Sequence, residues 1–462
     1  PSCNLYKTMG RIIMKQQTIH LVGAGLAGAL LAIMLVQKGH TVKLYEKRPD
    51  PRKAGMEGGR SINLALAFRG LNALRAAGLD DEVMAQVVMM RGRMVHDIDG
   101  NTNFLRYGKD DSEVIWSVHR GRLNLAMIDA AELQGVKIIF NAKISAIDVD
   151  KKLLYIDFFD RKEIEPYERL IAADGAGSSV RHSLVNQGII NEKIEPLGHL
   201  YRELEIAPTL KNEFKLDANS LHIWPRGGFM CIALPNTEKT FTVTLFLPEK
   251  GQQSFENIQT AQAARTFFQQ YFPDALNLIE DFDTDWENNP ESALSTLYLN
   301  TWHYQDSIVL LGDAAHAMVP FHGQGMNCAF EDCLALVEAI ENEHNWNSVI
   351  ASYEQQRQAN ALAIQEMALE NYIEMRDKVD DAQFLLQRIL ERKLAELHPT
   401  KFIPRYTMVS FQLIDYAIAQ SRGNIQRQIL QTLTQEKTDI AEVDFNLALK
   451  LINQQLEPIH YD

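Results

Sequence analysis

The chain has 462 residues, of which 46% are hydrophobic and 23% charged, and its formal net charge at pH 7 is −14. This length allows two or three domains with a large core, and the negative charge argues against binding to nucleic acid or to an anionic membrane surface, since both select basic faces. The four cysteines form no CxxC pair and have no zinc-type spacing, so we expect no disulfide framework, no metal site and a reducing, cytoplasmic location.

The two ends of the chain predict neither targeting nor membrane insertion. No uninterrupted apolar run of about 18 residues occurs, so we expect no membrane-spanning helix. Residues 1–13 contain only the short apolar pair Ile12-Ile13, which is too little for a signal peptide. Because Met14 stands just before the first predicted strand, we expect this leader to be disordered or an artefact of the start site. The polar C-terminus predicts no tail anchor.

Residues 18–46 predict a strand, a glycine-rich turn, a helix and a second strand that ends on an acid. Gly23 suits the positive φ of a tight turn, Gly25 lets backbone approach a pyrophosphate, and Gly28 permits close helix–strand packing. The helix N-terminus supplies free N–H groups and partial positive charge for phosphates. Glu46, 18 residues after Gly28, stands where such folds bind a ribose hydroxyl. Together these features predict a dinucleotide site.

The following segments alternate between helix and strand. A polar loop (48–59) precedes a strand and a helix that reaches Gly78, and residues 115–135 are predicted to be mainly helical. The alternating segments 137–148 and 152–159 predict strands of an antiparallel excursion. A second glycine cluster follows Leu170-Ile171, where Asp174-Gly175 taken alone is typical of a plain turn.

Residues 199–247 contain four short β-rich runs separated by turns. They predict one antiparallel sheet, in a layer separate from the nucleotide-binding fold. From about residue 347 onward the chain is rich in Glu, Gln, Ala and Leu and predicts helices.

Residues 310–327 predict a strand, a Gly-Asp turn, a loop and a helix that begins near Met326 and Asn327. Asp313 at the end of the strand can accept hydrogen bonds from a sugar or ribityl hydroxyl. Gly323 and Gly325 leave room for a planar ring against the backbone, and the helix N-terminus points its positive end at that ring. A reduced flavin carries negative charge on its ring and a nicotinamide does not, so the segment favours FAD. The alternative is an ordinary strand–loop–helix corner with a capping Asp.

The order of these motifs resembles the single-component FAD-dependent aromatic hydroxylases: GAGLAG, then Asp174-Gly175, then Gly312-Asp313, with a β-sheet insert between the last two. Segments 60–66, 90–96, 310–327 and 402–406 are most similar to members that act on a free aromatic amino acid, and the resemblance runs from about residue 18 to 410. It implies an α/β fold with a Rossmann-like, glutathione-reductase-type FAD domain (14–195 and 296–375). An inserted antiparallel-sheet substrate domain (196–295) and a C-terminal helical region (376–462) complete it, with 81–110 contributing to the substrate site.

The same resemblance implies FAD as cofactor, with NADPH and O2 as co-substrates and a flavin C4a-hydroperoxide that passes one oxygen atom to an aromatic ring. The flavin performs this chemistry, so no side chain is assigned as catalytic. A homodimer is compatible with the resemblance, and no residue demands one. The predicted FAD contacts are the residues named above, Gly23, Gly25, Gly28, Asp174, Gly323 and Gly325, together with Ala27, Glu46, Arg48, Ala65, Arg120, Asp313, Met326 and Asn327.

The substrate contacts implied by the resemblance are Arg93, Tyr107, Asn371 and Tyr406. An Arg fork with phenol donors suits a carboxylate, although Arg93 could equally be a solvated strand residue and the tyrosines packing residues. Asn371 lies on an apolar helical stripe, so we expect its amide to be buried and bonded either to a core group or to a ligand. Phe321 and His322 precede Gly323 and are placed near the ring. Candidate apolar linings, which depend on strand register, are Leu221, Met230, Leu234 and Phe246.

Three alternatives remain. A related hydroxylase could act on another aromatic acid or a polyketide, and a non-catalytic protein could keep FAD without the chemistry. A flavin halogenase is disfavoured because the chain has no Trp-x-Trp-x-Ile-Pro segment.

Overall fold

The computed structural model of the protein describes residues 16–54, 63–377 and 381–459, so the prediction for residues 1–13 lies outside the described residues. The predicted βαβ unit is present as β1 (Thr18–Val22), α1 (Leu26–Gln37) and β2 (Thr41–Tyr45), with the two strands parallel. Gly23 has a φ of +99°, and a Cβ on Gly28 would lie 1.9 Å from the Gly23 carbonyl oxygen. Both glycines therefore do what the motif requires: one turns the chain and the other lets α1 lie against the turn.

The β1–α1–β2 unit belongs to a six-stranded sheet of order β18-β19-β12-β1-β2-β8. All pairings are parallel except that of the edge strand β18 (His303–Tyr304) with β19 (Ile308–Leu310). The remaining strands are β12 (Arg169–Ala172) and β8 (Lys137–Ile139). The carboxyl ends of β1, β12 and β19 lead directly into the three glycine motifs, so the sheet gathers them at one edge.

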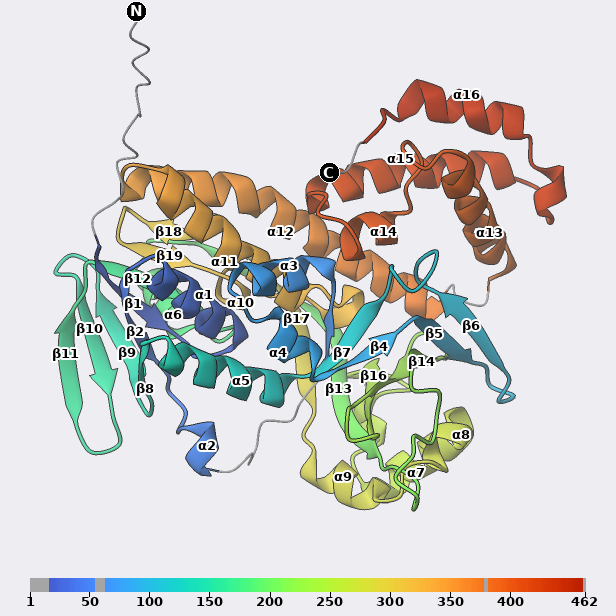
Figure 1. The fold of residues 1–462 in the computed structure, drawn as a ribbon. Coiled ribbons are helices and arrows are strands. Elements are labelled where there is room, and N and C mark those ends of the chain that lie inside the picture. The colour runs from blue at the N-terminus through green and yellow to red at the C-terminus, as the bar shows by residue number, and fades with distance from the viewer. Residues whose placement is uncertain (1–15, 55–62, 378–380, 460–462) are drawn as a thin grey trace, which may run out of the picture.

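The prediction of an antiparallel excursion at 137–148 is wrong in its first part. Residues 137–139 join the parallel sheet as β8, and the chain then turns at Asn141, which has a φ of 55°. Only afterwards do β9 (Lys143–Asp148), β10 (Leu153–Asp157) and β11 (Lys162–Pro166) form a three-stranded antiparallel sheet, seen at the left edge in Figure 1.

The four runs predicted between 199 and 247 form four neighbouring strands of a seven-stranded sheet of order β17-β13-β16-β15-β14-β5-β6. The sheet is antiparallel except where β14 pairs with β5 in parallel, because β5 and β6 come from an earlier part of the chain. The sheet thus takes strands from outside the predicted substrate domain (196–295): β5 and β6 precede it, and the strand over 292–299 runs past its end. The predicted domain boundaries stay a prediction. The bounds are β13 (Glu192–Ile206), β14 (Ser220–Pro225), β15 (Met230–Pro235), β16 (Phe241–Pro248), β17 (Ser292–Leu299), β5 (Gly92–His96) and β6 (Thr102–Arg106).

The two faces of the seven-stranded sheet have different roles. One face packs Trp224 and Phe241 against the apolar residues of α7 (Ala261–Tyr271), α8 (Pro273–Leu276) and α9 (Phe282–Asn288), which lie below the sheet in Figure 1. The other face carries Ile223, Met230 and Phe246 toward the FAD-binding half. Side chains alternate along a strand, so this packing fixes which residues can reach a ligand between the two halves.

A small antiparallel sheet, β3-β7-β4, lies where the two halves meet. It consists of β3 (Asn63–Leu66), β7 (Ile115–His119) and β4 (Val87–Met90). The segment predicted as helical from 115 thus begins as a strand and becomes helical only in α5 (Arg120–Leu133). Other helices of this half are α2 (Pro51–Ala54), α3 (Phe68–Ala76), α4 (Asp80–Met84), α6 (Ser179–Asn186), α10 (Asp313–His316) and α11 (Gly325–Asn342).

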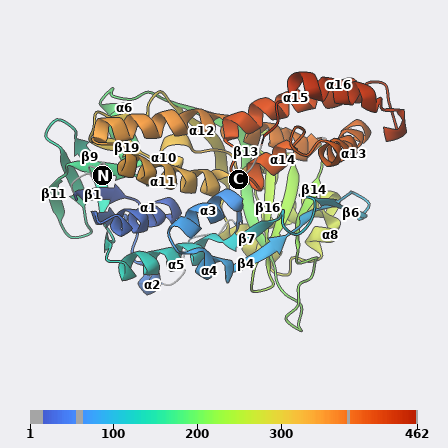
Figure 2. The ribbon, with the colours of Figure 1, turned by 45° about the horizontal axis from the view of Figure 1, so that its top comes forward.

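The C-terminal part is helical, as predicted. The long helix α12 (Trp346–Asp377) runs from the FAD-binding half toward the seven-stranded sheet, and the last four helices lie together at that end (Figures 1 and 2). They enclose a small core of their own, which includes Leu390, Ile429 and Ile452. Among the described residues, no helix is long and apolar enough to cross a membrane. The four helices are α13 (Ala382–Leu397), α14 (Arg405–Ser410), α15 (Tyr416–Thr434) and α16 (Phe445–Gln455).

Candidate active site

A cavity of about 600 Å³ lies along the edge where the three glycine motifs meet. All the predicted cofactor-binding residues line it except Gly28 and Asn327. Gly28 faces the Gly23 turn instead. The Asn327 amide accepts a hydrogen bond from Ala67 N (2.9 Å) and donates to the carbonyls of Ala65 (2.8 Å) and Gly323 (2.9 Å), so its side chain holds β3 and the glycine loop against α11. Gly28 thus packs against the turn, as the motif predicts. The cofactor contacts predicted for Gly28 and Asn327 stay predictions.

Glu46 closes one end of the cavity. Its carboxylate is buried and accepts hydrogen bonds from Ala24 N (3.0 Å), Arg48 N (2.9 Å) and Arg48 Nε (2.9 Å). Burial alone would raise the pKa of Glu46, but the hydrogen bonds and charge of Arg48 outweigh it and leave the pKa below its ordinary value. A charged acceptor is thus fixed at the end of β2, where a ribose hydroxyl can reach it.

Asp174 offers a further acceptor at the same edge. Its Oδ2 accepts hydrogen bonds from Ser179 N (2.7 Å) and Ser179 Oγ (3.1 Å), whereas Oδ1 is buried and has no partner within the described protein. A Cβ on Gly23 would lie 2.6 Å from Asp174 Cα, so the first two glycine motifs touch through their backbones. A buried acceptor without a donor is costly, and a bound cofactor with hydroxyl or N–H groups would satisfy it.

The N-terminus of α11 forms the opposite wall of the cavity. Gly323 has a φ of +66°, and a Cβ there would lie 2.9 Å from the Cβ of Ala65. Within the described part of the chain no side chain caps α11, an 18-residue helix, so its first N–H groups are left for a ligand. Gly323, Gly325 and Met326 line the cavity at this point. Exposed backbone and a positive helix end fit a planar ring that becomes anionic, as a flavin does on reduction.

A smaller, mostly apolar cavity of about 90 Å³ adjoins the first, and the two share Ala65, Pro320 and Gly323 in their walls. Leu221, Leu234 and Phe246 line it, as the sequence predicts. Met230 does not. It lies on the same sheet face, opposite Phe246 in register, but is covered by neighbouring core residues. Lining residues that the sequence analysis missed are Tyr201, Ile232, Thr242, Thr244 and Met375. The period of two along β16, at 242, 244 and 246, is the signal that could have found the threonines.

Arg93, Tyr107 and Tyr406 line this smaller cavity and also a neighbouring cavity of about 500 Å³, whereas none of them lines the cofactor cavity. The two phenol rings stack at 5.1 Å, and the Arg93 guanidinium lies 5.7 Å from the Tyr107 ring centroid and 6.0 Å from that of Tyr406. Arg93 Nε is buried without a partner within the described protein. Burial opposes the charge, but Tyr107, Tyr406 and then Glu374 hold the pKa of Arg93 above its ordinary value. A permanent cation with an unused donor is a receptor for an anion.

His322 lies between the apolar cavity and a wider polar one of about 500 Å³, which Asn371 also lines. Its ring stacks on Tyr406 at 5.6 Å, and its Nδ1 is buried without a partner in the described protein. Burial and the nearby Arg405 lower the pKa of His322 to about 3, so the imidazole is neutral. The Asn371 amide is buried, as predicted, and donates to the Phe321 carbonyl (2.6 Å).

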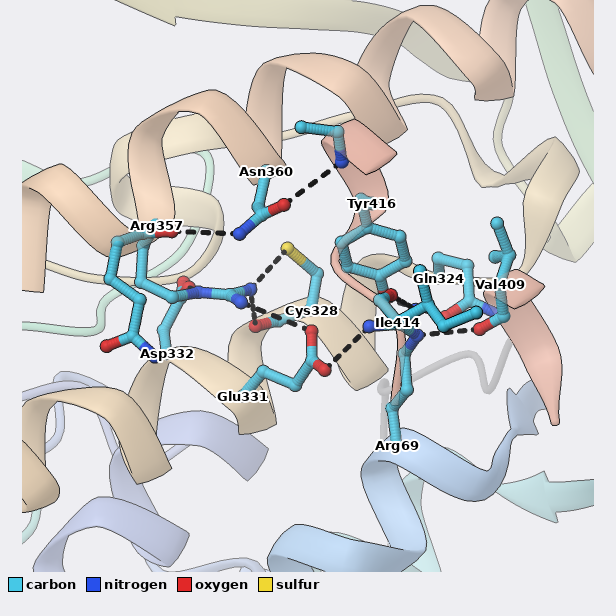
Figure 3. Close-up of polar contacts among 12 residues, drawn as sticks. Arg69, Gln324, Cys328, Glu331, Asp332, Arg357, Asn360, Val409, Ile414 and Tyr416 are labelled. Carbon is cyan, nitrogen blue, oxygen red and sulfur yellow. Dashed lines mark hydrogen bonds and ion pairs between the residues drawn. The ribbon is translucent and has the colours of Figure 1, made fainter. Parts of the chain in front are cut away.

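A buried network of charges lies behind the Gly-Asp turn, and Figure 3 shows the part of it around Arg357, Glu331 and Asp332. His316, Cys328 and Asp332 come close enough to hold a metal ion, but Arg357 lies among them. The Asp332 carboxylate accepts from Arg357 Nε (2.7 Å) and Gly312 N (3.1 Å) and bonds to His316 Nε2 (2.5 Å). Burial would raise the pKa of Asp332, yet the charges of His316 and Arg357 lower it to about 2. The group is thus an ion-pair network that fixes the turn before Asp313.

Comparison with known proteins agrees with this geometry. The family described as "FAD binding domain" matches residues 16–368. The kynurenine 3-monooxygenase of Xanthomonas axonopodis pv. citri (strain 306) is 50% identical over 450 residues, covering 96% of this chain and 98% of the relative. That of Xanthomonas campestris pv. campestris (strain 8004) is 50% identical over 447 residues, with the same coverage.

Two solved structures show the same fold. The tetrameric form of 2-methyl-3-hydroxypyridine-5-carboxylic acid oxygenase has a TM-score of 0.66 at 20% identity, covering 80% of this chain and 95% of that one. PqsL of Pseudomonas aeruginosa, in complex with 2-aminobenzoylacetate, has a TM-score of 0.65 at 20% identity, covering 79% and 97%. At this identity the likeness supports the architecture alone.

Proposed function

This chain belongs to the FAD-dependent aromatic monooxygenase family that includes the kynurenine 3-monooxygenases, and from that premise we propose that it hydroxylates L-kynurenine to 3-hydroxykynurenine. FAD is held in the larger cavity by the glycine turns, Glu46, Asp174 and the N-terminus of α11. When bound, FAD would supply the redox chemistry that transfers one oxygen atom of O2 to the substrate ring, with NADPH as the source of electrons.

One observation carries the proposal. The small apolar cavity shares Gly323 with the cofactor cavity, and its lining also includes Arg93, which does not line the cofactor cavity and whose buried Nε has no partner within the described protein. An aromatic amino acid has the matching chemistry, with an apolar ring at one end and a carboxylate at the other. With the carboxylate on Arg93, beside the stacked phenols of Tyr107 and Tyr406, the ring lies toward the wall that the two cavities share.

The protein's own contribution is then orientation and exclusion of water. Leu221, Leu234 and Phe246 of the sheet face, together with Phe321, surround the ring with apolar surface. A dry cavity protects a reactive oxygen species from loss as hydrogen peroxide, and a fixed ring places one carbon within reach. The ring amine of kynurenine already directs electron density to the neighbouring carbon, so no side chain has to act as a strong base.

His322 orients the substrate rather than transferring a proton. Because the lowered pKa keeps its imidazole neutral, the ring presents one N–H and one lone pair. The unpartnered Nδ1 at the cavity wall is suited to a hydrogen bond with a polar group of the substrate.

The test is NADPH consumption by the FAD-loaded protein with and without L-kynurenine, followed by mass measurement of the product. We expect faster consumption with L-kynurenine and a product heavier by one oxygen atom. Consumption that yields only hydrogen peroxide would point to another aromatic acid as substrate. A yellow protein that never oxidises NADPH faster with any aromatic acid would support the non-catalytic alternative.

A further inference from the structure

The first turn of α11, which the proposed function places against the flavin, has two polar side chains that could cap it. Gln324 occupies the N-cap position, and Asn327 is the third residue of the helix. The first amide in the helix's own ladder is Cys328 N, which donates to Gln324 O (2.8 Å). The N–H groups of residues 325–327 therefore lie outside that ladder, and a cap from either side chain would compete with a ligand for them.

Both side chains are instead directed away from the helix end. Asn327 is fully occupied by β3 and the Gly323 carbonyl, as described above. Gln324 is buried, and its Oε1 accepts a hydrogen bond of 2.8 Å from the hydroxyl of Tyr416, the first residue of α15 (Figure 3). One of the two anchors of this helix start thus comes from the C-terminal helical region, far away in sequence.

Tyr416 is itself held in place by a buried arginine. The guanidinium of Arg69 lies 4.0 Å from the centre of the Tyr416 ring and donates to the carbonyls of Met408 (3.0 Å), Val409 (2.7 Å) and Ile414. It also pairs with Glu331 of α11 at 2.8 Å. Burial raises the pKa of the Tyr416 phenol, so the hydroxyl keeps its proton and acts as the donor. The tyrosine is therefore a rigid, one-directional anchor for Gln324.

We propose that Tyr416 is a positioning residue for the flavin: through Gln324 it fixes the uncapped first turn of α11, so that residues 325–327 present their N–H groups to the anionic reduced ring. This inference rests on the proposed function only in placing FAD at α11. It explains why Tyr416 of α15, in the C-terminal region, is bonded to Gln324, which lies between Gly323 and Gly325. Loosening the anchor weakens the positive field at the ring without emptying the cavity.

The experiment compares the FAD-loaded wild type with Y416F, Q324M and the double variant. Sulfite adds to oxidised flavin and leaves the ring anionic, so its dissociation constant reports positive charge near the ring, and the two-electron potential of bound FAD is the second readout. We expect sulfite to bind about three- to tenfold more weakly to Y416F than to the wild type. If the variant also binds reduced flavin tenfold less well relative to oxidised flavin, the two-electron potential falls by about 30 mV. Q324M breaks the same bond, so the double variant should change no more than either single one.

The matched control is Y167F, which removes another buried tyrosine hydroxyl, one without a partner in the described protein. Its sulfite binding and potential should equal those of the wild type. If the Tyr416 bond only docked the C-terminal helices, Y416F would lose thermal stability with both flavin readouts unchanged, and that result would overturn the inference. Wild-type protein that binds no FAD would refute the proposed function instead.

Discussion

Replacing Arg93 tests the substrate site most directly. Arg93→Met keeps much of the side chain's apolar stem and removes the guanidinium, so packing between Tyr107 and Tyr406 changes little. Truncating one partner of a buried charged pair costs about 2–5 kcal/mol, and because Arg93 is only partly buried we expect about 2–4 kcal/mol. This predicts a loss of about 30- to 700-fold in kcat/KM for L-kynurenine. FAD binding should not change, because Arg93 does not line the cofactor cavity.

A substrate analogue makes the assignment specific to the carboxylate. Decarboxylated kynurenine has the same ring and ketone but no anion, so the wild type should use it with a loss similar to that of R93M on kynurenine. R93M should barely distinguish the two compounds, since the group that senses the carboxylate is gone. Arg93→Lys keeps the charge and loses the planar fork, and its activity should fall between the two. NADPH oxidation with product mass, at several concentrations of each compound, gives kcat/KM for each of the three proteins on both compounds.

Two outcomes would refute this reasoning. If R93M retains the full preference for kynurenine over its decarboxylated analogue, the carboxylate binds elsewhere. If R93M loses FAD, the variant has disturbed the fold, and the substrate assignment of Arg93 loses its basis in a separate cavity.

Three further predictions concern the scaffold. Gly28→Ala should give protein that cannot bind FAD, because its Cβ would lie 1.9 Å from the Gly23 oxygen. Gly25→Ala should fold and bind FAD about tenfold or more weakly, since its Cβ would meet no atom of the described residues and Gly25 lines the cofactor cavity. FAD titration checks both. Asp332→Asn removes a buried charge from its partners and should lower the free energy of unfolding by about 3–5 kcal/mol, measured in urea. Burial lowers the pKa of His222 to about 4, so below about pH 6.5 the unfolded chain takes up a proton at this residue and the folded chain does not. Acidification from pH 7 to 5 should therefore lower the free energy of unfolding by about 2 kcal/mol through His222. His222→Gln should remove that contribution from the pH dependence measured by urea unfolding.

The cofactor half of the fold could be read from the sequence because its motifs are local. Gly23 and Gly28 act within one turn of each other, and Glu46 follows at the end of the next strand. Such features depend on backbone conformation and short spacing, which a single sequence displays. Asn327 shows the limit: its position was found, but its amide is bonded to β3, a strand about 260 residues earlier.

The substrate half was harder because its surroundings come from distant segments. β14 is paired in parallel with β5, and no pattern in either strand indicates that partner. Register decides that Leu234 faces the cavity, whereas packing above the sheet decides that Met230, on the same face, is covered. Hydrophobic alternation gives the two faces of a strand but does not say what lies over each residue. The Tyr416–Gln324 bond joins residues 92 apart and had no sequence signal at all.

The backbone of the glycine loop and the side chains of the smaller cavity have different roles. The wall that both cavities share, at Ala65, Pro320 and Gly323, is set by a glycine in the left-handed conformation and by the Asn327 amide behind it. Arg93 of β5 and Tyr406 of α14 line the smaller cavity but not the cofactor cavity. On the proposed function, we therefore expect a substitution at either residue to change which aromatic acid is held while its ring still reaches the same place on the cofactor. We expect a substitution at the shared wall to change that place for every substrate. The fraction of NADPH consumption that yields hydroxylated product should then change by the same factor whichever aromatic acid is supplied.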